Sequence, residues 1–240
     1  MDVTTPMYSF PEKGQKELGV RPQLASWDAA GSSSQVRLEE FLSEAVKVCD
    51  PQFGRLAGLA ALRLDVGLPE TTPLLDQHDL DNYLFPLVTR LSRSGRTFVS
   101  VWGTKRHSSA SHLAVVAAVP ASPDTAWPHV FDVRTTASAG TAAFKEQIDE
   151  QLARALPLPD GPLRLHIGFV VGPRRQWPNL WKPTIDALGK VLGRTAPDRP
   201  WHPRDGRIVQ LGLSTRTDPS LGNNVVLRIH AGPASGSTAP

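Results

Sequence analysis

The sequence predicts an α/β protein made of two tandem repeats, and three observations lead to this fold class. Residues 79–88 align with residues 176–185 without a gap. Residues 62–67 (LRLDVG) resemble residues 163–168 (LRLHIG) and are identical at four of six positions. Segments with helical or strand periodicity also follow one another in the same order around both pairs. Internal duplication explains this common order better than the alternative, two generic α/β units that share a pattern by chance.

The first expected repeat covers residues 22–120. Leu38, Phe41 and Leu42 recur at the spacing of one helix face. Leu62 and Leu64 alternate as they would on a strand. The expected elements are, in order, a short strand at 24–27, an amphipathic helix at 36–48, a strand at 60–66, the segment from Asp79 with a helix to about residue 91, and strands at 97–102 and 112–119.

The second expected repeat covers residues 129–233. Its expected elements are a strand at 130–133, a helix at 144–156, a strand at 163–168, a helix from the second motif to about residue 192, and strands at 206–209 and 225–230. Prolines and glycines without periodicity predict a loose arm at 1–21, a proline-rich linker at 121–128 and a flexible tail at 234–240. Two tandem copies are expected to form an intramolecular pseudo-dimer.

Composition excludes several classes of protein. The chain has 240 residues, 40% of them hydrophobic, so it can bury a substantial core. Its net charge of +3 is compatible with a polyanionic partner without requiring one. The single cysteine, Cys49, rules out an internal disulfide framework and is expected to be a buried apolar residue. With no long apolar run and no signal-peptide core, a cytoplasmic protein is expected. Phosphate-loop, dinucleotide and serine-hydrolase motifs are also missing from the sequence.

The segment Asp79-Leu80-Asp81-Asn82 carries the clearest chemical signal. Asp79 and Asp81 are two residues apart, so in an extended segment both side chains point to the same side. Paired carboxylates suit Mg²⁺, which can polarise a phosphodiester and activate water. The alternative is helix capping, because Asp81 and Asn82 precede an apolar-periodic run. The sequence leaves both interpretations open.

Together the two motifs resemble those of the RusA-like Holliday-junction resolvases. The shared pattern is Asp-x-Asp-Asn, then a lysine three residues after the asparagine, an aspartate four residues later and an acidic residue before the next strand. The resemblance covers roughly residues 22–120 and 129–233. It implies that the motif aspartates and the later acid bind catalytic Mg²⁺ and that the lysine assists. In that family the enzyme works as a homodimer on branched DNA.

The first copy keeps only part of this pattern. Asp79 and Asp81 match the aspartate pair, and Asn82 matches the asparagine. Phe85 stands where the family has its lysine, and Ser94 stands where it has the later acid. A metal site around Asp79 and Asp81 would therefore have to be completed by other acids.

The second copy keeps the complementary part. It retains the asparagine, the lysine, the helix aspartate and the later acid, as Asn179, Lys182, Asp186 and Asp205. Gln176 and Pro178 replace the aspartate pair. Completing acids could therefore be Asp76 nearby or, across the pseudo-dimer, Asp186 or Asp205. If the copies do not combine their residues, the site is inactive.

The resemblance therefore implies a Mg²⁺-dependent endonuclease for branched or structured DNA, with a partly degenerate site and acting as a monomeric pseudo-dimer. Its expected catalytic residues are Asp79, Asp81, Lys182, Asp186 and Asp205, and its expected metal ligands are Asp79 and Asp81. Basic and aromatic residues around the second motif indicate DNA contacts from Arg174, Arg175, Trp177 and Lys182. Trp181 could instead belong to the core, with the arginines merely solvated. The alternative functions are a catalytically silent DNA-binding or interaction module and a scaffold without a DNA role.

Overall fold

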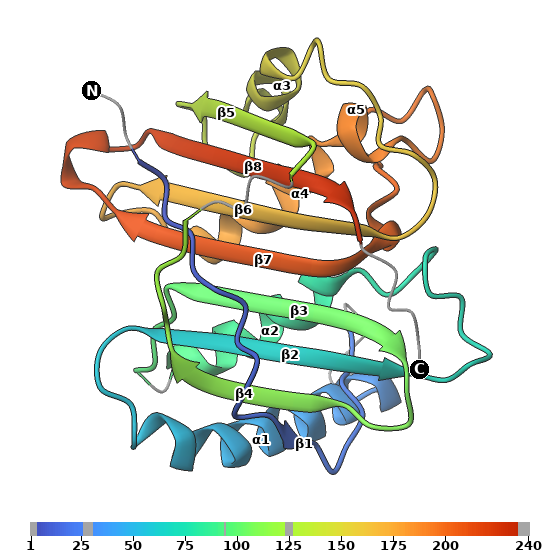
Figure 1. Ribbon diagram of the computed structural model, residues 1–240, viewed down its shortest axis with the longest axis vertical. Coiled ribbons are helices and arrows are strands. Elements are labelled where there is room, and N and C mark those ends of the chain that lie inside the picture. Colours follow the sequence, from blue (N-terminus) through green and yellow to red (C-terminus); the bar gives the residue numbers. More distant parts are fainter. Residues whose placement is uncertain (1–3, 26–30, 94, 123–126, 235–240) are drawn as a thin grey trace.

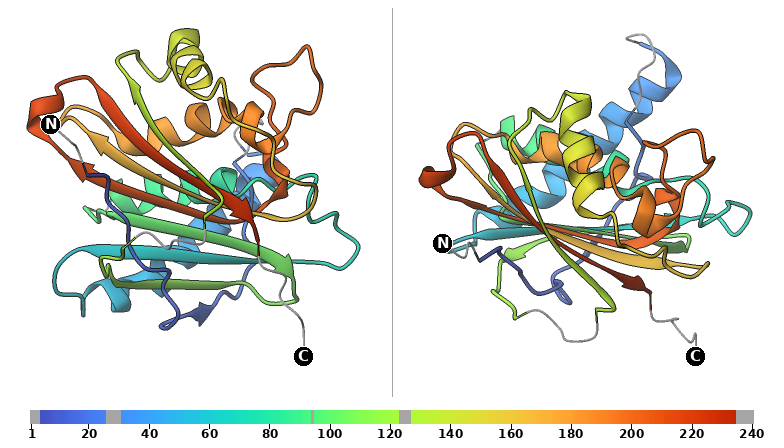
Figure 2. Two further views of the ribbon diagram at one scale, coloured as in Figure 1. Left: turned by 45° about the horizontal axis from the view of Figure 1, so that its top comes forward. Right: turned by 90° about the horizontal axis from the view of Figure 1, so that it is seen from above.

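The computed structural model describes residues 4–25, 31–93, 95–122 and 127–234. It shows one mixed sheet of eight strands with helices on one face (Figures 1 and 2), which confirms the α/β class. The strands are β1 (Lys16–Glu17), β2 (Ala60–Leu68), β3 (Ser100–His107), β4 (His112–Ala117), β5 (His129–Thr135), β6 (Leu163–Val171), β7 (Ile208–Thr217) and β8 (Val225–Pro233). The helices are α1 (Ser33–Phe53), α2 (Leu80–Arg93), α3 (Ala142–Gln151), α4 (Trp181–Asp186) and α5 (Gly189–Leu192), with short 3-10 segments η1 (Trp177–Leu180), η2 (Asp205–Arg207) and η3 (Pro219–Leu221).

The pairing directions of the sheet decide which segments meet. The strand order is β1-β4-β2-β3-β7-β6-β8-β5. In one half β2 is parallel to β3 and antiparallel to β4, and in the other half β6 is parallel to β7 and antiparallel to β8. The two halves join through the antiparallel pair β3–β7. As a result, the carboxyl ends of β2 and β6 lie at opposite edges of the sheet, and the end of β2 shares its edge with the start of β7.

The core follows the periodicities read from the sequence. Leu38, Phe41 and Leu42 are buried on α1, as their helical spacing predicts. Strands β2 and β6 are buried almost throughout, as expected of strands covered on both faces. Cys49 is fully buried, which confirms its expected place in the core.

Several element boundaries differ from those predicted. Strand β3 starts at Ser100 and continues to His107, beyond the apolar run, because its pairing with β2 continues to that residue. The second motif lies largely within η1, which is followed by α4 and α5 rather than by one continuous helix. Leu24 and Ala25 are not in a strand. The rest of the strand expected at 24–27, Ser94, linker residues 123–126 and tail residues 235–240 lie outside the described residues.

The expected loose arm at 1–21 is packed onto the protein in its described part, residues 4–21. Figure 1 shows this segment crossing the strands, and Figure 2 shows it on the face opposite the helices. Tyr8 forms an antiparallel bridge with Pro120. The Phe10 ring packs edge-on against Trp102, with ring centroids 5.3 Å apart. The arm is ordered because it covers apolar side chains on the face that no helix shields. Among the described residues, no helix combines the length and apolar character needed to cross a membrane.

Candidate functional site

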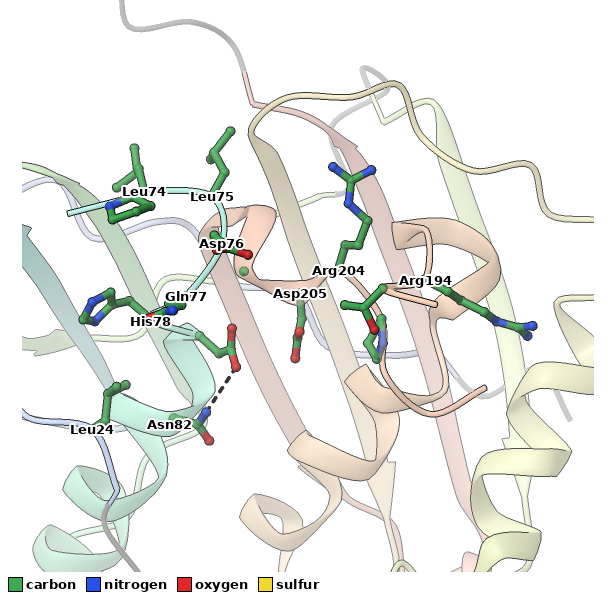
Figure 3. Close-up of a pocket in the computed structure, with 15 residues that line it drawn as sticks. Leu24, Leu74, Leu75, Asp76, Gln77, His78, Asn82, Arg194, Arg204 and Asp205 are labelled. Atoms are coloured by element: carbon green, nitrogen blue, oxygen red, sulfur yellow. Dashed lines mark hydrogen bonds between the residues drawn. The ribbon is translucent and has the colours of Figure 1, made fainter. Parts of the chain in front are cut away.

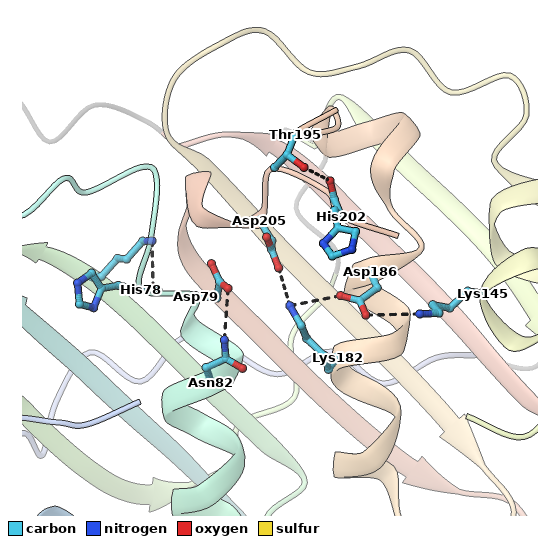
Figure 4. Close-up of polar contacts among 10 residues, drawn as sticks. His78, Asp79, Asn82, Lys145, Lys182, Asp186, Thr195, His202 and Asp205 are labelled. Carbon is cyan, nitrogen blue, oxygen red and sulfur yellow. Dashed lines mark hydrogen bonds and ion pairs between the residues drawn. The ribbon is translucent and has the colours of Figure 1, made fainter. Parts of the chain in front are cut away.

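Three carboxylates from distant parts of the sequence meet where the two halves join. Asp79 immediately precedes α2, Asp81 lies in its first turn, and Asp205 opens η2 before β7. Each can offer an oxygen that lies within 4.8 Å of the oxygens offered by the other two. Figure 4 shows Asp79 and Asp205 approaching from the two sides of the junction. They meet because the sheet brings the end of β2 and the start of β7 to one edge.

Asp81 is the most unusual member of this cluster. Its residue is only 3% exposed. Within the part of the chain that the structure describes, its carboxylate has no hydrogen-bond or salt-bridge partner. Burial raises the pKa of Asp81 to about 7, although the nearby Lys182 ammonium acts in the opposite direction. Burial and the neighbouring Asp205 also raise the pKa of Asp79. Burial, more than the neighbouring charges, therefore disfavours the ionised form of both carboxyl groups.

Helix capping does not account for these carboxylates. No backbone N–H among the described residues donates to the side-chain carboxylate of Asp79 or Asp81; the N–H of Asn82 donates to the main-chain carbonyl of Asp79, at 3.1 Å. The Asp79 Oδ2 instead accepts a hydrogen bond of 3.3 Å from the side-chain amide of Asn82. Asn82 therefore orients Asp79, whose Oδ1 has no hydrogen-bond donor among the described residues.

Lys182 connects the cluster to Asp186. Its Nζ lies 2.8 Å from Oδ2 of Asp205 and 3.3 Å from Oδ1 of Asp186 (Figure 4). Partial burial disfavours the charged lysine, but Asp81, Asp205 and Asp186 outweigh it and raise the pKa of Lys182. Asp186 also pairs with Lys145 at 3.8 Å. Asp186 is outside the group of converging oxygens, so its position suits a residue that holds Lys182.

Lys105, on β3, is a neighbour that the sequence did not single out. It is 3% exposed, and its ammonium donates to the backbone carbonyls of Gln77, His78 and Gly206. Burial lowers the pKa of Lys105 to about 8, against the opposite effect of Asp79 and Asp205. In the sequence it appears only as the first residue of a basic run after an apolar strand. Its carbonyl partners are visible only in three dimensions.

A groove of about 1110 Å³ opens beside the cluster (Figure 3). Asp79 and Asn82 line one wall, and Asp205, Arg194 and Arg204 line the other. Arg204 is paired with the exposed Asp160 at 2.7 Å. The groove is open enough for an extended ligand, and the guanidinium of Arg194, on the same wall, pairs with Asp149 at 3.5 Å.

The residues predicted to contact DNA are divided between two places. Lys182 lies at the cluster, whereas Arg174 and Arg175 follow the carboxyl end of β6, toward the opposite edge of the sheet. The guanidinium of Arg175 donates to the backbone carbonyl of Asn223, with the Nε bond at 2.9 Å. Trp177 packs edge-on against Trp181, with ring centroids 4.8 Å apart. Trp181 is fully buried, which confirms the interpretation that it belongs to the core.

The corresponding position in the second half has no comparable cluster. Gln176, Pro178 and the exposed Asn179 follow β6 there, so the motif supplies no carboxylate. Ser94, the remaining counterpart, lies outside the described residues. Within the described ranges, Asp79, Asp81 and Asp205 are the only group of at least three potential metal ligands.

The donor set fits a hard divalent cation. Oxygens bound to one Mg²⁺ at about 2.1 Å lie at most about 4.2 Å apart. The oxygens here lie within 4.8 Å of one another, so a contraction of about 0.6 Å at most would bring them into range. Carboxylates are the ligands that Mg²⁺ prefers, and no histidine or thiol competes in this group.

Comparisons of this chain with protein-family models, curated proteins and solved structures found no match.

Proposed function

We propose that this protein is a Mg²⁺-dependent endonuclease of the RusA-like kind, built from two tandem repeats that form an intramolecular pseudo-dimer. Two features support the proposed architecture. The halves have the same strand order and directions on either side of the β3–β7 pair. The carboxylates kept by one motif also lie beside the acid and lysine kept by the other. The two degenerate copies thus combine into one composite site.

The observation that carries the proposal is the buried, unpartnered Asp81 beside Asp79 and Asp205. Removing a carboxylate from water without a compensating partner costs several kcal/mol, on the order of magnitude found for buried polar groups. Such an arrangement is retained more readily where a cation offsets the cost. We infer that all three carboxylates hold Mg²⁺. When bound, Mg²⁺ would polarise a phosphodiester and lower the pKa of a bound water.

The remaining residues have roles that follow from their positions. Asn82 orients Asp79 through its side-chain amide. Lys182 places an ammonium at the edge of the cluster, where it can neutralise charge that develops on a phosphate oxygen. Arg194 and Arg204 line the groove and can contact the flanking phosphates of the strand. DNA is therefore the proposed substrate, with branched DNA the class implied by the resemblance.

A nicking assay tests this function. Wild-type protein is incubated with Mg²⁺ or Mn²⁺ and a panel of labelled four-way junctions, flaps and linear duplexes. Asp81→Asn is expected to lower the cleavage rate by orders of magnitude, because it removes a ligand charge while keeping side-chain size. Asp132→Asn is the matched control, since Asp132 lies on the edge strand β5 and is mostly exposed. Absence of cleavage by the wild-type protein on every substrate with either metal would contradict the proposal.

One observation favours a second candidate, a catalytically silent DNA-binding module. The Lys182 ammonium already lies 2.8 Å from Asp205, so it supplies part of the positive charge that a metal would provide. In a silent module, Lys182→Met would lower the free energy of unfolding, because the carboxylates lose their ammonium. Addition of Mg²⁺ would not change the stability of the protein. Salt-sensitive binding to DNA without cleavage would support this candidate.

A further inference from the structure

The two chain segments that carry the carboxylates are joined by one buried ammonium group. Nζ of Lys105 donates hydrogen bonds of 2.9 Å to the carbonyl of Gln77, 3.1 Å to that of His78 and 2.6 Å to that of Gly206. Gln77 and His78 immediately precede Asp79, and Gly206 immediately follows Asp205. A lysine ammonium has three donors, so all of them are used in this junction.

The backbones of these segments also pack directly against each other. A Cβ on Gly206 would lie 2.7 Å from both the carbonyl carbon and the oxygen of Asp76, a distance that requires the backbone to shift. His78 has a φ of 65°, a conformation that non-glycine residues rarely adopt. Its Nδ1 is 2.5 Å from the hydroxyl of Tyr83. A close junction with an unfavourable backbone conformation persists only where surrounding contacts hold it.

We propose that Lys105 is a positioning residue of the metal centre, which fixes Asp79 and Asp81 against Asp205 by binding both backbone segments. The inference rests on the proposed function insofar as that function requires the metal. Lys105 makes no hydrogen bond or ion pair with the carboxylates within the described residues, so it acts through the backbone. Lys182 differs, because its ammonium binds a carboxylate of the cluster directly.

Electrostatics and geometry predict opposite effects for Lys105. Its positive charge lies near the cluster and by Coulomb repulsion alone would weaken cation binding. Removing it would then increase metal affinity. If its hydrogen bonds hold the ligands in place, removing it instead lowers affinity, because three carbonyls lose their donor and the segments separate. The sign of the change therefore distinguishes the two roles.

Mn²⁺ affinity of two lysine variants provides the test. Calorimetric titration and Mn²⁺ electron paramagnetic resonance would compare Lys105→Met with Lys182→Met in the full chain. Lys105→Met is expected to weaken Mn²⁺ binding by about 10- to 100-fold, the effect usual for residues that orient metal ligands. Lys182→Met is expected to bind Mn²⁺ at least as tightly as wild type, since a competing ammonium is removed. Unchanged or tighter Mn²⁺ binding by Lys105→Met would overturn the inference.

A second pair of variants perturbs the junction from the other side, which covers the case where Lys105→Met does not fold. Gly206→Ala places a methyl group against the Asp76 backbone, whereas Gly140→Ala meets no atom within 4 Å. Weaker Mn²⁺ binding is expected for Gly206→Ala alone. Equal affinity of both variants, each folded by circular dichroism, would contradict a role for this junction.

The outcomes separate this inference from the proposed function. Wild-type protein that binds Mn²⁺ but cleaves no DNA would leave the positioning role intact and overturn the nuclease. If wild type cleaves DNA and Lys105→Met binds Mn²⁺ as tightly as wild type, the nuclease function is supported and the positioning role of Lys105 is overturned. Failure of wild type to bind Mn²⁺ would overturn both.

Discussion

Asp81→Asn should stabilise the metal-free protein at pH 8, although it should abolish activity. The wild-type carboxylate is buried and has no partner among the described residues, whereas an asparagine cannot ionise. Burial raises the pKa of Asp81 from 3.8 to about 7. That difference of about three units corresponds to about 4 kcal/mol at 1.36 kcal/mol per unit. We expect the variant to gain up to about this free energy of unfolding at pH 8.

The sign of the pH dependence follows from linkage. Because the folded-state pKa of Asp81 is raised, folding favours the protonated form. Its contribution is fully present below pH 3.8 and is lost as the pH rises toward about 7. The advantage of Asp81→Asn should therefore be small near pH 4, increase up to about pH 7 and then level off. Mg²⁺ should stabilise the wild type, with a larger effect at pH 8 than at pH 5, and should not stabilise the variant in the same way.

Urea unfolding in EDTA, at pH 5 and pH 8, measures the difference. Asp65→Asn is the matched control, because Asp65 is also buried but accepts hydrogen bonds from Arg63 at 2.8 Å and Thr104 at 2.6 Å. That substitution should destabilise the protein by about 1–3 kcal/mol, since it weakens a satisfied network. If Asp81→Asn is less stable than wild type at pH 8, or if its advantage does not shrink at pH 5, the reasoning is refuted.

Three further outcomes are expected. Because each chain has one composite centre, it should cut one strand at a time and convert supercoiled plasmid to nicked circles. Linear product formed at the same rate would contradict this, since it requires a cut in each strand. Arg204→Ala should weaken DNA binding and reduce the slope of log affinity against log salt concentration by about one. Arg174→Ala, toward the opposite edge, should change the affinity and the slope less. The reverse result would place the DNA interface at the second motif. Phe10→Ala should lower the free energy of unfolding by about 2 kcal/mol in urea, because Phe10 packs against Trp102 and under the Arg63 guanidinium; no change would mean that the arm adds no stability.

The composite site shows how far sequence reasoning could reach. The two motifs supplied Asp79, Asp81, Lys182 and Asp205 as candidates, and all four lie together. Their spacing along the chain did not decide between Asp76, Asp186 and Asp205 as the completing acid. That choice depends on the antiparallel β3–β7 pair, which brings the start of β7 to the end of β2.

The sequence by itself determined the α/β class and the buried faces of the helices, because these follow from local periodicity. Only the tertiary structure decided that Lys105 binds two distant segments and that residues 4–21 cross the open face of the sheet. A lysine after an apolar strand and an arm without apolar periodicity both look solvent-exposed in one dimension. Their partners are backbone carbonyls and side chains far away in the sequence, and only the paired sheet brings these within reach.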